Sequence, residues 1–317
     1  MVKVLMFHST PDRLAELRRE FPTVTFVDLA KRSDAAADLA DCDVIFGGCT
    51  NEEFLVARGL KWIQASSAGV EFMWQIPTIA KSSVVVTNAR GAHAATIAEH
   101  TFGLLLALTR DIIGHHDYQK KHEWVRGEMA NRLVGIKGAT MGLVGFGNIG
   151  RAIARRAVGF EMNVLAVDAQ KVPASEGVAE VWSLARLDDM CRQVDVLTIA
   201  APITPETRGM IGAKQIGAMK RGSYLIAISR GGIVNEPALI DALKSGHLAG
   251  AGLDVQETEP LPANSPLWDA PNILITPHDS GVSNLTTNLM WSIFFDNLRR
   301  YVKGDPLTNT VDKSLGY

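Results

Sequence analysis

Short apolar runs alternate with polar helical stretches along the N-terminal part of the chain. The polar stretches predict helices over Pro11–Glu20 and Asn51–Arg58. Strands that alternate with helices are typical of a parallel sheet covered on both faces. The pattern therefore predicts a small α/β unit with strands at Val4–Phe7, Val24–Val27, Val44–Phe46, Trp62–Gln64 and Val84–Thr87.

A second series of strands and helices follows, with clearer turns between its elements. It indicates a doubly wound sheet of about six parallel strands, which is an ordinary size for such a sheet. The chain then closes with a helix over Asn284–Lys303, whose apolar residues recur at helical spacing and which we expect to return to the first unit. The six strands are predicted at Thr140–Val144, Val164–Val167, Val194–Ala200, Tyr224–Ile228, Leu248–Leu253 and Ile273–Thr276.

The segment between the two series, from Gly91 to Arg110, is apolar on almost every side. A helix with so small a polar face is stable only where it is buried nearly all round. We therefore expect the helix over 94–109 to run between domains or into a partner subunit.

Length, composition and charge narrow the class of protein. The chain has 317 residues, of which 47% are hydrophobic and 21% charged, so it can form one large or two medium domains with a substantial core. Its net charge of −2 gives no broad positive electrostatic potential that would attract nucleic acid or anionic lipid. We expect neither a nucleic-acid partner nor a membrane partner.

The cysteines and the apolar runs help to predict the cellular compartment of the protein. The three cysteines, Cys42, Cys49 and Cys191, form no CxxC pair, and this favours a reducing environment over a disulfide framework or a zinc site. The apolar run Phe102–Leu108 ends well before the roughly 18 residues that a membrane helix needs. The N-terminus lacks a signal peptide's cleavage site, so the predicted location is the cytoplasm.

A glycine pattern after the strand Thr140–Val144 indicates a dinucleotide site. Gly145, Gly147 and Gly150 fit G-x-G-x-x-G between a strand and a helix, where such glycines give a tight turn, room for a pyrophosphate and close helix packing. The N-terminus of the helix then faces the phosphates. Glycines in an ordinary α/β turn are the alternative reading.

Asp168 ends the next strand, 18 residues after Gly150, near the position of the acid that binds a ribose 2′-hydroxyl. At about 4 Å a 2′-phosphate would be repelled by a carboxylate by roughly 4 kcal/mol at an effective dielectric near 20. NAD is therefore favoured over NADP, although Lys171 lies close enough in sequence to soften the repulsion.

Three polar residues follow the carboxyl ends of later strands, where open α/β sheets bind their ligands: Arg230, Glu259 and His278. They lie in the segments Ile-Ser-Arg-Gly-Gly (228–232), Gly-Leu-Asp-Val-Gln-Glu-Thr-Glu-Pro (252–260) and Thr-Pro-His (276–278). With the glycine loop and Ala98-Glu99-His100, these segments make the chain resemble the D-isomer-specific 2-hydroxyacid dehydrogenases over nearly its whole length.

The resemblance implies a site. It implies a catalytic Arg230, a Glu259–His278 pair, a nicotinamide-binding Asp254, and backbone N–H groups near Ser67–Val70 that hold part of a substrate carboxylate. The expected substrate-binding residues are Ser67, Ala68, Gly69 and Val70. The expected cofactor-binding residues are Gly145, Gly147, Asn148, Ile149, Gly150, Asp168, Pro202, Thr207, Ile228, Ser229, Asp254 and Gly281.

The expected reaction requires these residue types independently of the family resemblance. Hydride transfer to a 2-keto acid requires a proton donor, and imidazole titrates nearest physiological pH, so His278 is the expected acid/base. A carboxylate beside it, Glu259, favours the imidazolium and orients the ring. A guanidinium offers paired donors to a carboxylate and can polarise the adjacent carbonyl, which is the role expected of Arg230.

Each of these residues also has an ordinary reading. Arg230 could form a strand-end salt bridge, Glu259 could be a turn residue before Pro260, and His278 could be a loop histidine. Their occurrence at successive strand ends of one sheet favours the functional reading. His93, His100 and the nearby histidines complete no metal-ligand motif, so no metal is predicted and they are read as core or solvated residues.

The resulting prediction is an α/β protein with two doubly wound parallel-sheet domains. A dinucleotide-binding Rossmann domain, 96–281, is inserted into a flavodoxin-like substrate domain formed by 1–95 and 282–317. The expected activity is the NAD(H)-dependent interconversion of a small 2-keto acid and its D-2-hydroxy acid, and a homodimer is expected. The alternatives are an NAD(H)-sensing regulator of corepressor type, and a formate- or phosphite-type dehydrogenase.

Overall fold

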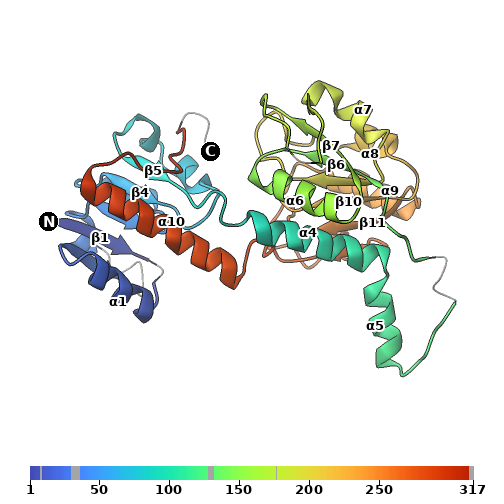
Figure 1. Cartoon of the computed structure of the whole chain (residues 1–317), viewed down its shortest axis with the longest axis horizontal. Coiled ribbons are helices and arrows are strands. Elements are labelled where there is room, and N and C mark those ends of the chain that lie inside the picture. The colour runs from blue at the N-terminus through green and yellow to red at the C-terminus, as the bar shows by residue number, and fades with distance from the viewer. Residues whose placement is uncertain (8, 30–35, 128–131, 176, 314–317) are drawn as a thin grey trace. The chain divides into compact units, whose positions relative to one another are not determined.

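Two parallel β-sheets organise the chain (Figure 1). The computed structural model describes residues 1–7, 9–29, 36–127, 132–175 and 177–313. The chain forms a first unit, Met1–His93 with Ser283–Tyr317, and a second unit, Ala94–Val282, which is inserted into the sequence of the first. The predicted α/β class with two parallel sheets is confirmed. The substrate and cofactor roles expected of the units stay predictions.

The first unit contains the smaller sheet, five strands in the order β2-β1-β3-β4-β5. This order is the flavodoxin-like one. Its helices begin at local caps: the Thr10 side chain accepts the Arg13 N–H, and Thr50 and Glu53 form a capping box. The elements are β1 Val2–Met6, α1 Pro11–Glu20, β2 Val24–Asp28, α2 Ala36–Leu39, β3 Val44–Phe46, α3 Asn51–Val56, β4 Trp62–Gln64, the short 3₁₀ helices η2 Glu71–Gln75 and η3 Ile79–Lys81, β5 Val85–Thr87 and α10 Asn284–Lys303.

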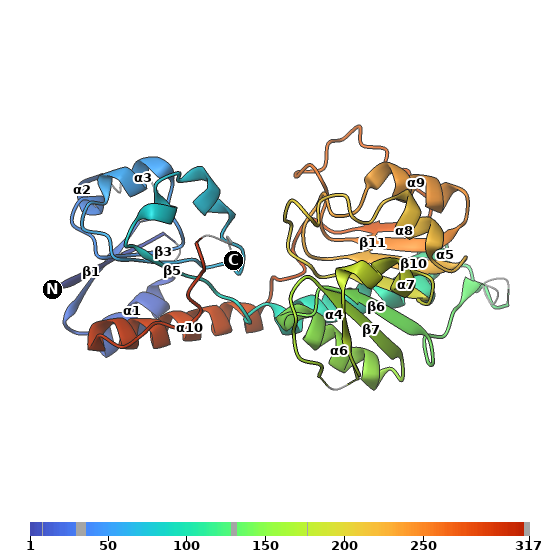
Figure 2. The same ribbon diagram turned by 90° about the horizontal axis from the view of Figure 1, so that it is seen from above.

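Helix α10 brings the C-terminal part of the chain back onto this sheet, as the sequence predicts. The Ser283 side chain caps its first turn, and its apolar face joins Trp62 and other sheet residues in one core cluster. Figure 2 shows α1 and α10 together on one face of the sheet and α2 and α3 on the other. The side chains of α10 in this cluster are Trp291, Phe294, Phe295 and Leu298.

The second unit contains a sheet of seven strands in the order β12-β11-β10-β9-β6-β7-β8. The order reverses between β6 and β9, which is where doubly wound sheets bind their ligands. Sequence analysis missed the edge strand β8. The elements are α4 Ala94–Thr109, α5 Ile112–Lys120, β6 Thr140–Val144, α6 Asn148–Gly159, β7 Asn163–Asp168, β8 Val181–Ser183, η5 Leu184–Arg186, α7 Leu187–Cys191, β9 Val196–Ile199, α8 Ala213–Ala218, β10 Ser223–Ala227, α9 Glu236–Lys244, β11 Leu248–Leu253 and β12 Ile273–Ile275.

Helix α4 is less enclosed within the chain than its composition predicts. It packs in one core cluster with the sheet and α6, but only seven of its 16 residues are buried, and Leu106, Ala107 and Leu108 are half-buried. Only Glu99 and Gly103 of α4 are exposed, and the expectation that the helix packs between domains or into a partner subunit stays a prediction. In the described part of the chain, no helix is both long and apolar enough to cross a membrane.

Candidate active site

The three glycines of the turn between β6 and α6 have different surroundings. Gly145 has φ +96°, and a Cβ there would lie 2.6 Å from the backbone nitrogen of Ala201, beyond the end of β9. A Cβ on Gly150 would lie 2.3 Å from the Gly145 carbonyl oxygen, so this glycine lets the helix pack on the turn. A Cβ on Gly147 would meet nothing within 4 Å. The protein itself therefore needs glycine at 145 and 150, while the space beside Gly147 is open to a ligand.

Asp168, at the end of β7, is tied to this turn. Its Oδ2 accepts the Phe146 N–H at 2.7 Å, and its Oδ1 accepts the Gln170 N–H at 2.8 Å. Asn148 and Ile149 begin the twelve-residue helix α6, whose first N–H groups have no intrahelical partner. The turn thus presents backbone donors at a helix N-terminus beside a fixed carboxylate, an arrangement suited to a pyrophosphate and a ribose.

Two further expected cofactor segments lie beyond β9 and β10. The Thr207 hydroxyl donates to the Pro202 carbonyl at 2.7 Å and closes a turn. Ile228 and Ser229 are buried directly after β10, and the Ser229 Oγ has no hydrogen-bond partner among the described residues. A buried hydroxyl without a partner is costly and indicates a missing donor or acceptor. This buried hydroxyl and the open space at Gly147 are features that would suit a bound dinucleotide.

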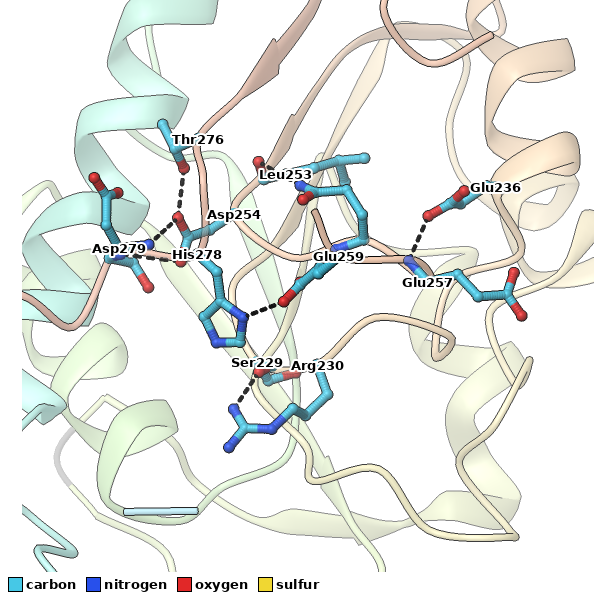
Figure 3. Close-up of polar contacts among 12 residues, drawn as sticks. Ser229, Arg230, Glu236, Leu253, Asp254, Glu257, Glu259, Thr276, His278 and Asp279 are labelled. Carbon is cyan, nitrogen blue, oxygen red and sulfur yellow. Dashed lines mark hydrogen bonds and ion pairs between the residues drawn. The ribbon is translucent and has the colours of Figure 1, made fainter. Parts of the chain in front are cut away.

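Two of the three residues predicted to carry the chemistry form a direct pair. His278 Nδ1 lies 2.7 Å from Glu259 Oε2 (Figure 3), and the two side chains are 41% and 33% exposed. Glu259 is itself oriented, because its Oε1 accepts the Gln256 N–H at 3.0 Å. With Nδ1 engaged by a carboxylate, the other ring nitrogen, Nε2, is the atom available to exchange a proton with a ligand.

Arg230 is joined to this pair through the backbone. A Cβ on Gly231 would lie 1.7 Å from the Gln256 carbonyl oxygen, so the turn that carries Arg230 touches the turn that orients Glu259. The Arg230 guanidinium donates from Nη1 to the Ser229 carbonyl at 2.7 Å (Figure 3). Sequence analysis did not single out Gly231, although its place next to Arg230 in a Gly-Gly turn was visible.

Asp254 lies at the end of β11 and is fully buried. Its Oδ1 accepts the Thr276 hydroxyl at 2.6 Å and the Asp279 N–H at 3.1 Å, and its Oδ2 accepts the Ser280 N–H at 3.0 Å (Figure 3). Gly281, another expected cofactor residue, follows directly and is half-buried. The carboxylate therefore fixes the loop that contains His278.

A histidine that sequence analysis read as a core or solvated residue joins this cluster. His100, on α4, places Nε2 3.0 Å from the Thr276 hydroxyl and 3.8 Å from Asp254 Oδ1. One side-chain atom each of His100, Asp254 and Asp279 lie within 4.8 Å of one another. Nothing in the spacing of residue 100 relative to 254 or 276 predicts this meeting.

The expected substrate loop of the first unit, Ser67–Val70, follows β4. Its carbonyl groups are occupied: the Ala89 N–H donates to Ser67, the Asn88 side chain to Ala68, the Ser67 hydroxyl to Gly69 and the Met73 N–H to Val70. Among the described residues, the N–H groups of the loop have no hydrogen-bond acceptor. A loop with satisfied carbonyls and open N–H groups is suited to an anion.

Two cysteines are unsuited to nucleophilic chemistry. Burial raises the pKa of Cys42 and of Cys191 to about 11, so both thiols are protonated at neutral pH.

Comparison with known proteins gives a consistent result. The family model for the NAD binding domain of D-isomer specific 2-hydroxyacid dehydrogenases matches residues 102–280. A glyoxylate reductase from Korarchaeum cryptofilum is 31% identical to the chain, over 99% of this chain and 96% of that protein.

Solved structures agree with these sequence matches. A D-isomer specific 2-hydroxyacid dehydrogenase family protein from Aeromonas salmonicida has a TM-score of 0.87 and 30% identity, over 98% of this chain and 99% of that one. An NADPH-dependent glyoxylate/hydroxypyruvate reductase from Sinorhizobium meliloti, solved with NADP and sulfate, has a TM-score of 0.84 and 27% identity over the full length of both chains.

The backbone approach at Gly231 leads to a test of how the site is assembled. We expect Gly231→Ala to lower the free energy of unfolding by about 1–3 kcal/mol, because a methyl group has no room beside Gln256. The matched control is Gly217→Ala in α8, where a Cβ meets nothing within 4 Å. It should be neutral or stabilising by up to about 1 kcal/mol. Thermal and urea unfolding measure both; equal effects of the two variants would contradict the close packing.

Proposed function

Because the chain belongs to the D-isomer specific 2-hydroxyacid dehydrogenase family, we propose that it interconverts a small 2-keto acid and its D-2-hydroxy acid with NAD(H). The observation that carries the proposal is the 2.7 Å contact of His278 Nδ1 with Glu259 Oε2. It leaves one imidazole nitrogen for the substrate and fixes the direction of the ring. A pair of this kind, oriented by a third group, is typical of general acid/base catalysis.

Each residue has a defined task in the proposed reaction. A bound nicotinamide supplies the hydride for the carbonyl carbon. His278 delivers a proton from Nε2 to the carbonyl oxygen, and takes it back in the reverse direction. Glu259 holds the imidazole through Nδ1 and so fixes the direction in which Nε2 points. Arg230 binds the carboxylate and polarises the adjacent carbonyl. The substrates to test are glyoxylate, hydroxypyruvate, pyruvate and phenylpyruvate, and the open N–H groups of Ser67–Val70 support the prediction that they hold a carboxylate.

Steady-state NADH oxidation with these acids tests the activity. We expect His278→Ala to lower kcat by about 10²–10⁴-fold, since the proton donor is lost. Glu259→Gln should lower kcat less. Arg230→Ala should both raise KM for the acid and lower kcat, because carboxylate binding and carbonyl polarisation are lost together. The matched control, Glu257→Gln, changes an exposed carboxylate that points away from His278 (Figure 3) and should retain wild-type kinetics.

Two outcomes would contradict this mechanism. Undiminished turnover in all three site variants would remove it. Tight NADH binding without turnover of any acid would instead favour the NAD(H)-sensing regulator. Turnover of formate or phosphite alone would favour a formate- or phosphite-type dehydrogenase.

The preference for NAD over NADP is proposed from Asp168. Both of its oxygens accept backbone N–H groups, so the side chain is fixed beside the glycine turn, at the expected ribose position. The similar Sinorhizobium meliloti protein is NADPH-dependent, so the proposed preference rests on Asp168 and not on membership of the family.

A titration of both cofactors tests this preference. Wild-type protein should bind NADH more tightly than NADPH, and Asp168→Asn should lower that ratio at least about tenfold, or about 1.4 kcal/mol, because the repulsion of the 2′-phosphate is removed. Asp241→Asn, which changes an exposed acid on α9, should leave the ratio unchanged. Tighter binding of NADPH by the wild-type protein would refute the assignment.

We also propose that two copies of the chain associate through the α4–α5 region of the second unit. Helix α5 has no buried residue and stands away from the seven-stranded sheet (Figure 1). Ile112, Ile113 and Trp124 are 53%, 49% and 93% exposed, and half-buried apolar residues of α4 lie in the same part of the chain. Exposed apolar groups concentrated in this way are typical of a subunit interface.

Light scattering after size-exclusion chromatography tests the association. The wild-type protein should elute as a dimer, and the double variant Ile113→Glu with Trp124→Glu should shift it to a monomer, because two charges would be buried without partners. Trp74→Glu is the matched control, since Trp74 is 62% exposed in the first unit. A monomeric wild-type protein, or an unaltered double variant, would contradict the proposed interface.

A further inference from the structure

The loop that contains His278 is held in an unfavourable backbone conformation. His278 has φ +57°, in the left-handed region. There the Cβ of an L-residue comes too close to the following carbonyl oxygen, so the conformation is disfavoured relative to the right-handed region. Such a residue persists where the surrounding contacts determine it. The contacts that hold this backbone conformation therefore determine where the His278 imidazole lies.

The buried carboxylate of Asp254 supplies these contacts. It binds Thr276, two residues before His278, and the N–H groups of Asp279 and Ser280, which follow His278 directly. Three hydrogen bonds to one fully buried carboxylate thus enclose the histidine on both sides in the sequence. Because charge-assisted bonds of this kind are the stronger ones, the loop has little freedom while Asp254 is in place.

The Thr276 hydroxyl sets the direction of the next contact. A hydroxyl has a single hydrogen, and that of Thr276 is donated to Asp254 at 2.6 Å. The Thr276 oxygen can then only accept from His100 Nε2, 3.0 Å away. His100 must therefore carry a proton on Nε2, either as the neutral Nε2–H tautomer or as the imidazolium. A nitrogen that donates in this way is not available as a metal ligand.

We propose that His100 is a positioning residue for proton transfer, acting through Thr276 and Asp254 on the loop that holds His278 against Glu259. The inference rests on the proposed function, because it assigns a purpose to the placement of His278. It adds to that function a polar relay from α4, 178 residues before His278 in the sequence. The relay is made within the second unit.

Paired substitutions separate hydrogen bonding from simple packing. His100→Leu and Thr276→Val remove the donor and the hydroxyl, and each should lower kcat about tenfold while the Kd for NADH changes less than threefold. His100→Gln and Thr276→Ser keep an N–H donor and a hydroxyl, and each should restore most of kcat. Thr109→Val is the matched control: it removes a buried α4 hydroxyl bonded to the Leu105 carbonyl and should leave kcat unchanged.

Nuclear magnetic resonance of ¹⁵N-histidine-labelled protein provides a readout without turnover. The wild-type spectrum should show a proton on His100 Nε2, and in His100→Leu the signal of the His278 Nδ1 proton should exchange faster with water. An Nδ1–H tautomer at His100 would overturn the proposal, as would wild-type kcat in His100→Leu or equal impairment of His100→Gln. Absence of turnover in the wild-type protein would refute the proposed function, whereas the tautomer tests the relay independently.

Discussion

The hydrogen bond between His278 and Glu259 is the interaction on which the proposed chemistry depends. An imidazole on a loop can rotate, and a carboxylate on Nδ1 fixes both the orientation of the ring and the nitrogen that remains free. The two residues come from loops after different strands, β11 and β12. Their 2.7 Å separation therefore requires two loops to be fixed at once. Gln256 fixes one through its N–H, and the buried carboxylate of Asp254 fixes the other.

Parallel strands explain how distant segments form this arrangement. The carboxyl ends of β10, β11 and β12 lie side by side because the three strands are neighbours in one sheet. The Gly231 backbone then packs so closely on the Gln256 carbonyl that the loops after β10 and β11 are in direct contact. On the other side of the strand reversal, Gly145 makes a similar approach to Ala201. Glycine thus serves in both places to bring one loop backbone against another.

The sequence predicts the periodic and the locally encoded parts of this structure. The alternation of strands and helices predicts both sheets, and the apolar spacing predicts α10 with the bounds that the structure has. The strand β8 is only three residues long and partly exposed, so its burial pattern is too short to detect. The position of His100 was not predicted either, since its contact with Thr276 depends on how α4 lies across the sheet and not on any local pattern. Likewise, the exposure of part of α4 depends on which elements pack against each side of the helix, and composition does not specify these elements.

The central claim is that His278 and Arg230 meet the same substrate beside the nicotinamide. A crystal structure with NAD and an unreactive keto-acid analogue such as oxamate tests it most directly. The account predicts His278 Nε2 within hydrogen-bonding distance of the carbonyl oxygen of the analogue, with the Glu259 contact kept and the Arg230 guanidinium on its carboxylate. An analogue bound away from these groups, or an imidazole turned from it with Glu259 unpaired, would contradict the account.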